Sequence, residues 1–424
     1  LESDRMNVGR VLADAGYATG FVGKYHVHDT DHSKQGSLFG NLDVPKNAKY
    51  SDELNKRKFK LEKLQREMVK KNGFTWSKNI YWGNLKQPFK GHNPEWTAQA
   101  ALEFIEEHKE QPFYLHCCPT LLHGPNGEWF KSMMEKELAS GEGFLKKPLN
   151  LIDRKSVWKR IQKAGLTESE VGYLWMDDSL GLILDKLDEL GIADNTIVVF
   201  VSDHGSERKG SLIKTRGTEI PCLIRWPRVI KPGSVSRGLL QNTDFVPTWF
   251  ELTKARIPED YHIDGKSLVP MFKDPTVSIR KYIYGEQGAA RAIKTEDFEY
   301  ISIRYTDEQI TGASSKRADR AYKTLLGLSG GISRARYFHP DIFSADQLYD
   351  LSKDPDSKKN LANKPGYAKQ LKKMKAMLAR TIKELGPRPY GDFVPGKGTS
   401  DADASQKVLD KLAAYHAKEG KKKR

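Results

Sequence analysis

The sequence feature that most constrains the fold is a run of apolar residues, 197–201, that breaks abruptly into Ser202-Asp203-His204-Gly205. A short β-branched and aromatic run between polar residues is typical of a strand buried on both faces of a parallel sheet. Ligands of open α/β sheets bind at the carboxyl ends of the strands. There Asp203 and His204 can bind a cation, and Gly205 allows a sharp turn. A turn that merely caps the next element is the alternative.

A second polar cluster follows a predicted helix and strand near the start of the chain. The pattern predicts a helix over 7–15 and a strand over 17–22, leading into Gly23-Lys24-Tyr25-His26. A lysine and a histidine two residues apart on an extended strand share one face. Both could then reach one anion, with Gly23 giving the backbone room to approach it. The alternative is an ordinary surface loop.

The region that follows is polar and lysine-rich, and it predicts a loop-rich excursion over about 29–91. Within it we expect a short helix at 61–69 and a short hairpin strand at 78–82. An amphipathic helix at 97–108 and a buried strand at 113–117 come next, followed by His123 in a Pro-flanked segment. His123 is a candidate site residue because it follows a strand end. A loop histidine without a role is the alternative.

Helices and strands continue to alternate towards the carboxyl end, which favours βαβ units with right-handed crossovers. Asp177 and Asp178, within the first of these helices, are interpreted as its solvated face rather than as a metal pair. The predicted helices are 171–190, 242–252 and 367–385, and the predicted short strands are 282–284, 292–295, 299–303 and 347–351.

Composition narrows the class of protein. The chain has 424 residues, 38% of them hydrophobic and 29% charged, which is typical of a globular protein with a sizeable core. No apolar run is long enough to span a bilayer. A net charge of +15 attracts polyanions such as sulfated glycans, although part of it lies in the terminal segment 421–424. Three cysteines make no disulfide framework.

The motifs together resemble the sulfatase family of the alkaline-phosphatase-like superfamily. The resemblance rests on Asp203-His204, on Lys209-Gly210-Ser211, on a strand that closes with Arg-Trp-Pro at 225–227, and on 12–26. It implies an α/β fold, with a mostly parallel sheet flanked by helices and a smaller carboxyl-terminal α+β subdomain. The implied division is a catalytic domain at 1–275, an antiparallel-sheet subdomain at 276–385, and a linker with a basic tail at 386–424.

The resemblance also implies roles for the site residues. Lys24 and Lys209 would bind the sulfate, His26 would contact the nucleophile, and His123 would serve the leaving oxygen. Asp203 and His204 would bind one calcium ion. The region after Lys209 is about one residue longer than the family pattern, so Lys214 is the reserve for the sulfate lysine.

Two family features have no counterpart here: the first strand with its Asp-Asp metal ligands, and the Cys-x-Pro-x-Arg motif whose cysteine becomes the formylglycine nucleophile. Cys117-Cys118-Pro119 lacks the arginine and is interpreted as an ordinary strand-end pair. We therefore expect a sulfatase lacking its first βα portion, which could itself be inactive.

The expected reaction is hydrolysis of sulfate esters of small molecules or glycans. We expect no nucleic acid partner, and a periplasmic or extracellular location. The alternatives are a phosphomonoesterase or phosphodiesterase of the same superfamily, and a non-catalytic polyanion-binding protein.

Overall fold

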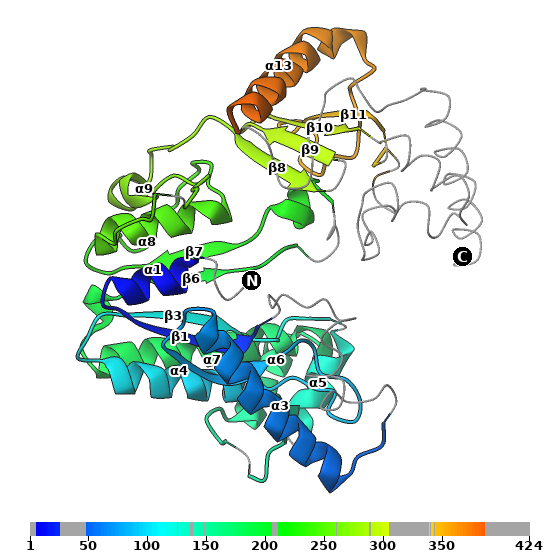
Figure 1. Cartoon of the computed structure of the whole chain (residues 1–424). Coiled ribbons are helices and arrows are strands. Elements are labelled where there is room, and N and C mark those ends of the chain that lie inside the picture. Colours follow the sequence, from blue (N-terminus) through cyan, green and yellow to red (C-terminus); the bar gives the residue numbers. More distant parts are fainter. Residues whose placement is uncertain are drawn as a thin grey trace, which may run out of the picture. The chain divides into compact units, whose positions relative to one another are not determined.

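The structure is a computed structural model, shown in Figure 1. It describes residues 6–25, 48–124, 126–135, 139–147, 149–205, 211–259, 261–287, 290–304, 339, 341–342 and 344–385. Contacts divide the chain into a first unit of Leu1–Thr196, Trp226–Arg228 and Thr243–Ser267, and a second of Ile197–Arg225, Val229–Asn242 and Leu268–Arg424. We describe each unit by itself. No helix in the described ranges is long and apolar enough to cross a membrane.

The first unit is built on a parallel sheet of three strands in the order β2-β1-β3. Side chains of the central strand alternate between its two faces. Phe21 lies against Phe74 on one face, whereas Val22 packs on the other against Ala100 and Ala101. The last two belong to α4, which runs beside α7 below the sheet in Figure 1. The elements are β1 (Ala18–Lys24), β2 (Trp76–Tyr81), β3 (Phe113–Cys118), α4 (Pro94–His108) and α7 (Val171–Glu189).

Helix α1 (Val8–Asp14) precedes the central strand, as the sequence predicts. Its first turn is capped by Asn7, whose side chain accepts a hydrogen bond from the backbone N–H of Arg10 at 3.2 Å. Val11 and Leu12 are buried with Phe250 of α8 (Phe245–Thr253). Further elements of this unit are α5 (Gly127–Met134), β4 (Ala139–Ser140), β5 (Gly143–Phe144), α6 (Arg154–Lys163), η1 (Glu168–Glu170) and η2 (Ala193–Asn195), and η4 (Asn242–Asp244) has its last two residues here.

The prediction of a loop-rich excursion was wrong for the part of it that the structure describes, 48–91. Helix α3 (Asp52–Lys71) fills much of this stretch and is about twice as long as the predicted helix. Its buried face includes the polar residues Lys58, Glu62 and Gln65, so the hydropathy pattern shows a shorter buried face than the helix has. Glu62 is satisfied there by Arg66 at 2.6 Å and by the backbone N–H of Ile80 at 2.9 Å. The predicted hairpin strand is instead β2, which pairs in parallel with β1.

The run 197–201 gives β6 (Val198–Val201), but the prediction of a fully buried parallel strand was wrong. β6 pairs antiparallel with β7 (Cys222–Arg225). Its side chains are partly exposed, with Val201 at 38% and Leu223 of β7 at 65%. An apolar run indicates a strand, but it does not fix the direction of the partner strand or how much of each face is covered.

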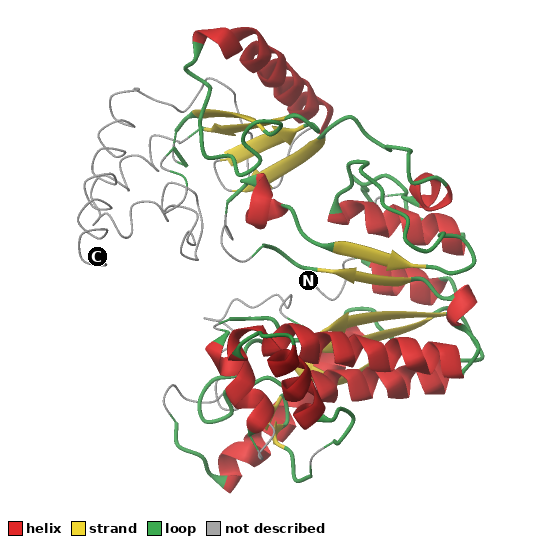
Figure 2. Ribbon diagram, turned by 180° about the vertical axis from the view of Figure 1, so that it is seen from behind, coloured by secondary structure: helices red, strands yellow, loops and turns green. Residues whose placement is uncertain are grey.

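A four-stranded antiparallel sheet in the order β11-β10-β9-β8 forms the rest of the second unit's core. Helix α13 (Ala368–Leu385) packs on it through Met374 and Leu378, which contact Ile293, Tyr300 and Leu348. Figure 2 shows the helix lying along this sheet. The small sheet with one helix that the resemblance implies is therefore present, while the predicted domain limits stay predictions. The elements are β8 (Ile283–Gln287), β9 (Ala290–Lys294), β10 (Phe298–Ile303), β11 (Asp346–Asp350), α9 (Val269–Lys273), η3 (Lys214–Thr218) and η5 (Pro365–Tyr367).

Candidate active site

Lys24 is the last residue of β1, and the glycine before it allows two strands to meet closely. Gly23 has a φ of +89° in the left-handed region that favours glycine. A Cβ atom at Gly23 would lie 2.1 Å from the carbonyl oxygen of Cys118 on β3. The space at Gly23 is thus filled by the neighbouring strand, not left for an anion as the sequence suggests.

Tyr25 anchors the chain immediately after Lys24. Its ring is buried and lies edge-on to Phe21, with ring centroids 4.8 Å apart. Its hydroxyl accepts a hydrogen bond from the Asn72 side chain at 2.9 Å. Burial raises the pKa of Tyr25, so the phenol stays neutral. The end of β1 is thereby fixed and Lys24 leaves the sheet at a defined point. His26 lies outside the described residues.

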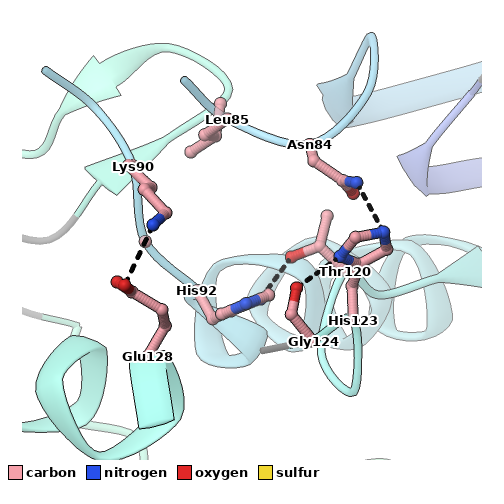
Figure 3. A pocket seen from close by; sticks show the side chains of 9 residues that line it. Asn84, Leu85, Lys90, His92, Thr120, His123, Gly124 and Glu128 are labelled. Atoms are coloured by element: carbon pink, nitrogen blue, oxygen red, sulfur yellow. Dashed lines mark hydrogen bonds and ion pairs between the residues drawn. The ribbon is translucent and has the colours of Figure 1, made fainter. Parts of the chain in front are cut away.

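Asn84 connects Lys24 to His123. The ammonium of Lys24 lies 3.4 Å from Oδ1 of Asn84, and Nδ2 of Asn84 lies 2.9 Å from Nε2 of His123. A lysine can only donate, so the amide oxygen faces Lys24 and the amide N–H₂ faces the imidazole. Nε2 of His123 is therefore an acceptor, and Nδ1 carries the hydrogen that it donates to the carbonyl oxygen of Gly124 at 2.9 Å. Figure 3 shows the two bonds of His123, to Asn84 and to Gly124.

The backbone of His123 is held by a buried tryptophan. Nε1 of Trp129 on α5 donates to the carbonyl oxygen of His123 at 2.9 Å. Trp129 belongs to the core cluster that also contains Trp175 of α7. The backbone N–H of His123 bonds to the carbonyl oxygen of Thr120 at 3.1 Å and closes a turn after β3. An exposed imidazole is thus carried on a rigid support.

A pocket of about 160 Å³ opens beside His123. Lys90 and Glu128 form an ion pair across it at 2.9 Å, as Figure 3 shows. Nδ1 of His92 lies 3.5 Å from the hydroxyl of Thr120. Burial, and then the nearby His123, lower the pKa of His92 to about 4, so this ring is neutral near pH 7. The lining residues are Asn84, Leu85, Lys90, Gly91, His92, Thr120, His123, Gly124 and Glu128.

Asn84, Lys90 and His92 are absent from the sequence-based set of site residues. One sequence signal could have placed His92. Asn93 followed by Pro94 is a helix-start signature, and Asn93 does cap α4 by accepting from the backbone N–H of Trp96 at 3.3 Å. A helix that begins after Asn93 places His92 directly before the helix. The predicted helix instead began three residues later, at 97.

Asp203 and His204 follow β6 in the second unit and face each other. Nε2 of His204 lies 3.3 Å from Oδ2 of Asp203, whose side chain is 80% exposed. The turn depends on Gly205, because a Cβ atom there would lie 2.1 Å from the carbonyl oxygen of Arg216. The backbone N–H of Gly205 also bonds to the carbonyl oxygen of Gly217 at 2.9 Å. The glycine predicted to allow a sharp turn is thus required by close backbone contact.

The carboxylate of Asp203 and the imidazole of His204 are chemically suitable ligands for a cation. They are too few to form a complete cation site. Calcium takes about six to eight oxygen ligands in proteins. Asp203 offers an exposed carboxylate and His204 one ring nitrogen, since its Nδ1 is bonded to the carbonyl oxygen of Gly205 at 2.9 Å. Among the residues with described positions, no group of three or more His, Cys, Asp or Glu side chains could hold a metal. Asp178 pairs with Arg160 and is half-buried, and Asp177 is exposed.

Lys214 begins the turn η3, and its ammonium lies 3.5 Å from Oε1 of Glu219. Lys209 lies outside the described residues, so the choice between the two lysines stays open. Cys117 and Cys118 are half-buried at the end of β3. Burial raises the pKa of the Cys117 thiol, which keeps it protonated and a poor nucleophile.

A family model described as Sulfatase matches residues 1–255, more than half of the chain. The chain belongs to the sulfatase family. A second model, described as N-sulphoglucosamine sulphohydrolase, C-terminal, matches residues 209–309. The family match and the similarity to solved sulfatases confirm the predicted α/β class.

Curated relatives and solved structures agree with this assignment. An ulvan-active sulfatase of Formosa agariphila is 32% identical over 196 residues, covering 43% of this chain and 36% of the relative. An N-acetylglucosamine-6-O-sulfatase of Bacteroides thetaiotaomicron is 28% identical over 218 residues, covering 50% and 34%. This sulfatase-family chain thus spans about a third of the length of these relatives.

Among solved structures, a sulfatase of glycosaminoglycan metabolism in Bacteroides thetaiotaomicron has a TM-score of 0.58 at 19% identity, covering 90% of this chain and 82% of the other. A protein solved with its substrate D-glucosamine-2-N,6-O-disulfate has a TM-score of 0.53 at 19% identity, covering 96% and 85%. These similarities establish the fold.

Proposed function

We propose that the protein containing this chain is a sulfuric ester hydrolase that acts on sulfated glycans. The observation that carries the proposal is the Lys24–Asn84–His123 arrangement beside a pocket, in a chain of the sulfatase family. The relatives named as ulvan-active sulfatase and N-acetylglucosamine-6-O-sulfatase support sulfated sugars as the substrate class. The net charge of +15 favours approach of polyanionic substrates.

The chemistry of sulfate-ester cleavage suits these side chains. Negative charge spreads over the peripheral oxygens in the transition state, so fixed cations beside them lower the barrier. Lys24 would bind one sulfate oxygen, and Lys209, with Lys214 as the reserve, would bind another. His123, when protonated at Nε2, would give that proton to the ester oxygen as the sulfur–oxygen bond breaks. His26 would contact the nucleophile.

Two parts of the proposed reaction come from family membership. The family implies a divalent cation, and we propose calcium with Asp203 and His204 among its ligands. When bound, such a cation would stabilise negative charge on the sulfate. The proposed nucleophile is a formylglycine that is not among these 424 residues. We also propose a periplasmic or extracellular location, where sulfated glycans are met.

The direct test is to incubate the complete protein with matched sulfate and phosphate esters and to measure released sulfate and phosphate by ion chromatography. The proposal predicts sulfate release from sulfated sugars and aryl sulfates at rates well above phosphate release. Preferential phosphate release would support a phosphatase of the same superfamily. Salt-sensitive binding of sulfated glycans without sulfate release would support a polyanion-binding protein.

A further inference from the structure

The pocket beside His123 has room for a single sugar ring, and its mostly apolar surface carries several polar groups. Its volume of about 160 Å³ is well above the roughly 10–15 Å³ that a single water molecule needs. That space suits one ring rather than an oligosaccharide. Leu85 contributes to the apolar part of the lining, and amide, hydroxyl, ammonium and carboxylate groups lie around it, as Figure 3 shows.

The lining supplies both hydrogen-bond donors and acceptors, which is what a sugar hydroxyl requires. Lys90 can only donate and Glu128, when ionised, can only accept, and their charged atoms lie 2.9 Å apart. Adjacent hydroxyls of a ring can bond one to each group. A sulfate or a carboxylate accepts only, and Glu128 would repel it. The Lys90–Glu128 pair therefore suits hydroxyls better than a second anion.

The charges of the lining cancel. Lys90 and Glu128 are of opposite sign, and His92 is neutral near pH 7 because burial lowers its pKa to about 4. Lys24 is not among the lining residues and reaches Asn84 at 3.4 Å. The Lys24 ammonium is thus separate from a pocket in which the charges of Lys90 and Glu128 offset each other.

We propose that this pocket, with the Lys90–Glu128 pair as its main recognition element, is a subsite for the uncharged, hydroxyl-bearing sugar ring of the substrate. The inference rests on the proposed function. It adds that a neutral sulfated sugar is preferred over one whose ring also carries a carboxylate or a second sulfate.

The kinetic test uses the complete protein and the single variants Lys90→Met and Glu128→Gln. Each should lower kcat/KM for N-acetylglucosamine 6-sulfate about tenfold more than kcat/KM for 4-nitrophenyl sulfate, because a hydrogen bond to a charged group is lost with the sugar alone. Lys86→Met is the matched control, since Lys86 is exposed on the same segment and is not among the lining residues. Equal losses on the two substrates would overturn the proposal.

A binding test separates failure of the subsite from failure of the proposed function. Saturation-transfer NMR would compare sulfate-free methyl glycosides of glucose, galactose, N-acetylglucosamine and glucuronic acid. The proposal predicts contact with at least one neutral glycoside that exceeds contact with the glucuronide and is lost in the Lys90→Met/Glu128→Gln double variant. It predicts this even if no sulfate is released from any ester. Preferred binding of the glucuronide, no bound neutral glycoside, or binding unchanged in the double variant would refute it.

Discussion

Asn84 donates its side-chain N–H to Nε2 of His123 at 2.9 Å, while its amide oxygen faces the ammonium of Lys24 at 3.4 Å. One exposed amide thus links an ammonium at the end of β1 to an imidazole in the turn after β3. The arrangement fixes which ring nitrogen of His123 carries hydrogen in the resting state.

Replacing Asn84 by alanine removes this link without creating a cavity, because the side chain is exposed. We expect kcat to fall about tenfold, the effect of losing roughly one positioning hydrogen bond. Nitrogen-15 NMR of the imidazole should show His123 as the Nδ1–H tautomer in the wild type and as a mixture in the variant. An unchanged tautomer together with unchanged kcat would remove Asn84 from the site.

Two variants distinguish which of Lys209 and Lys214 binds the sulfate. Lys209→Ala in the complete protein should reduce turnover by about 100-fold or more with little effect on folding, because a fixed cation at the sulfate is lost. Lys214, which already pairs with Glu219 at 3.5 Å, should tolerate alanine far better. If Lys214→Ala abolishes activity and Lys209→Ala does not, the assignment of the sulfate lysine is wrong.

A buried ion pair secures the segment around Lys214 to the antiparallel sheet. Lys294 and Glu299 lie 3.1 Å apart with side chains 3% and 0% exposed. Lys294 also donates to the carbonyl oxygen of Leu212, and Ser357 donates to Glu299 at 2.8 Å. Lys294→Met leaves the buried Glu299 carboxylate without its cation. The free energy of unfolding, measured by urea denaturation, should fall by about 3–5 kcal/mol.

The control for that variant is the double change Lys294→Met/Glu299→Met, which removes both charges and should lose much less stability. A second control is Lys70→Met, which breaks an exposed pair with Glu67 and should have no measurable effect. Equal losses in the single and the double variant would show that the charge pairing is not what holds this segment.

The lowered pKa of His92 leads us to expect that the free energy of unfolding falls in mild acid. Its folded-state pKa of about 4 lies below the ordinary value of 6.5, so the unfolded chain binds the proton first as pH falls. The contribution of His92 is intact above pH 6.5 and is lost as pH falls to about 4, by roughly 3 kcal/mol in all. Unfolding free energies of the wild type and His92→Asn should therefore converge between these values. Parallel curves would contradict the shift.

The sequence predicts most of the elements that carry the site, because their apolar patterns are strongly periodic. The strands predicted at 17–22 and 113–117 correspond to β1 and β3, which end one or two residues later, at Lys24 and Cys118. Helix α3 was largely missed because its buried face contains the polar residues Lys58, Glu62 and Gln65, which an apolar periodicity does not register.

The pocket could not be predicted by the same means. Asn84, Lys90 and His92 lie in irregular backbone between β2 and α4, and their positions depend on contacts such as Lys90 with Glu128, 38 residues apart in the sequence. The periodicity of apolar residues carries no information about such long-range contacts. The antiparallel pairing of β6 could not be predicted either, because an apolar run does not specify the direction of the partner strand.

The measurement that tests the central proposal most directly is the initial rate of sulfate release by the complete protein and by Lys24→Met, with 4-nitrophenyl sulfate and 4-nitrophenyl phosphate as paired substrates. We predict that the wild type prefers the sulfate and that Lys24→Met lowers kcat/KM for it by about 100-fold or more while unfolding at the same urea concentration. Preference for the phosphate, or a Lys24→Met variant as active as the wild type, would contradict the account.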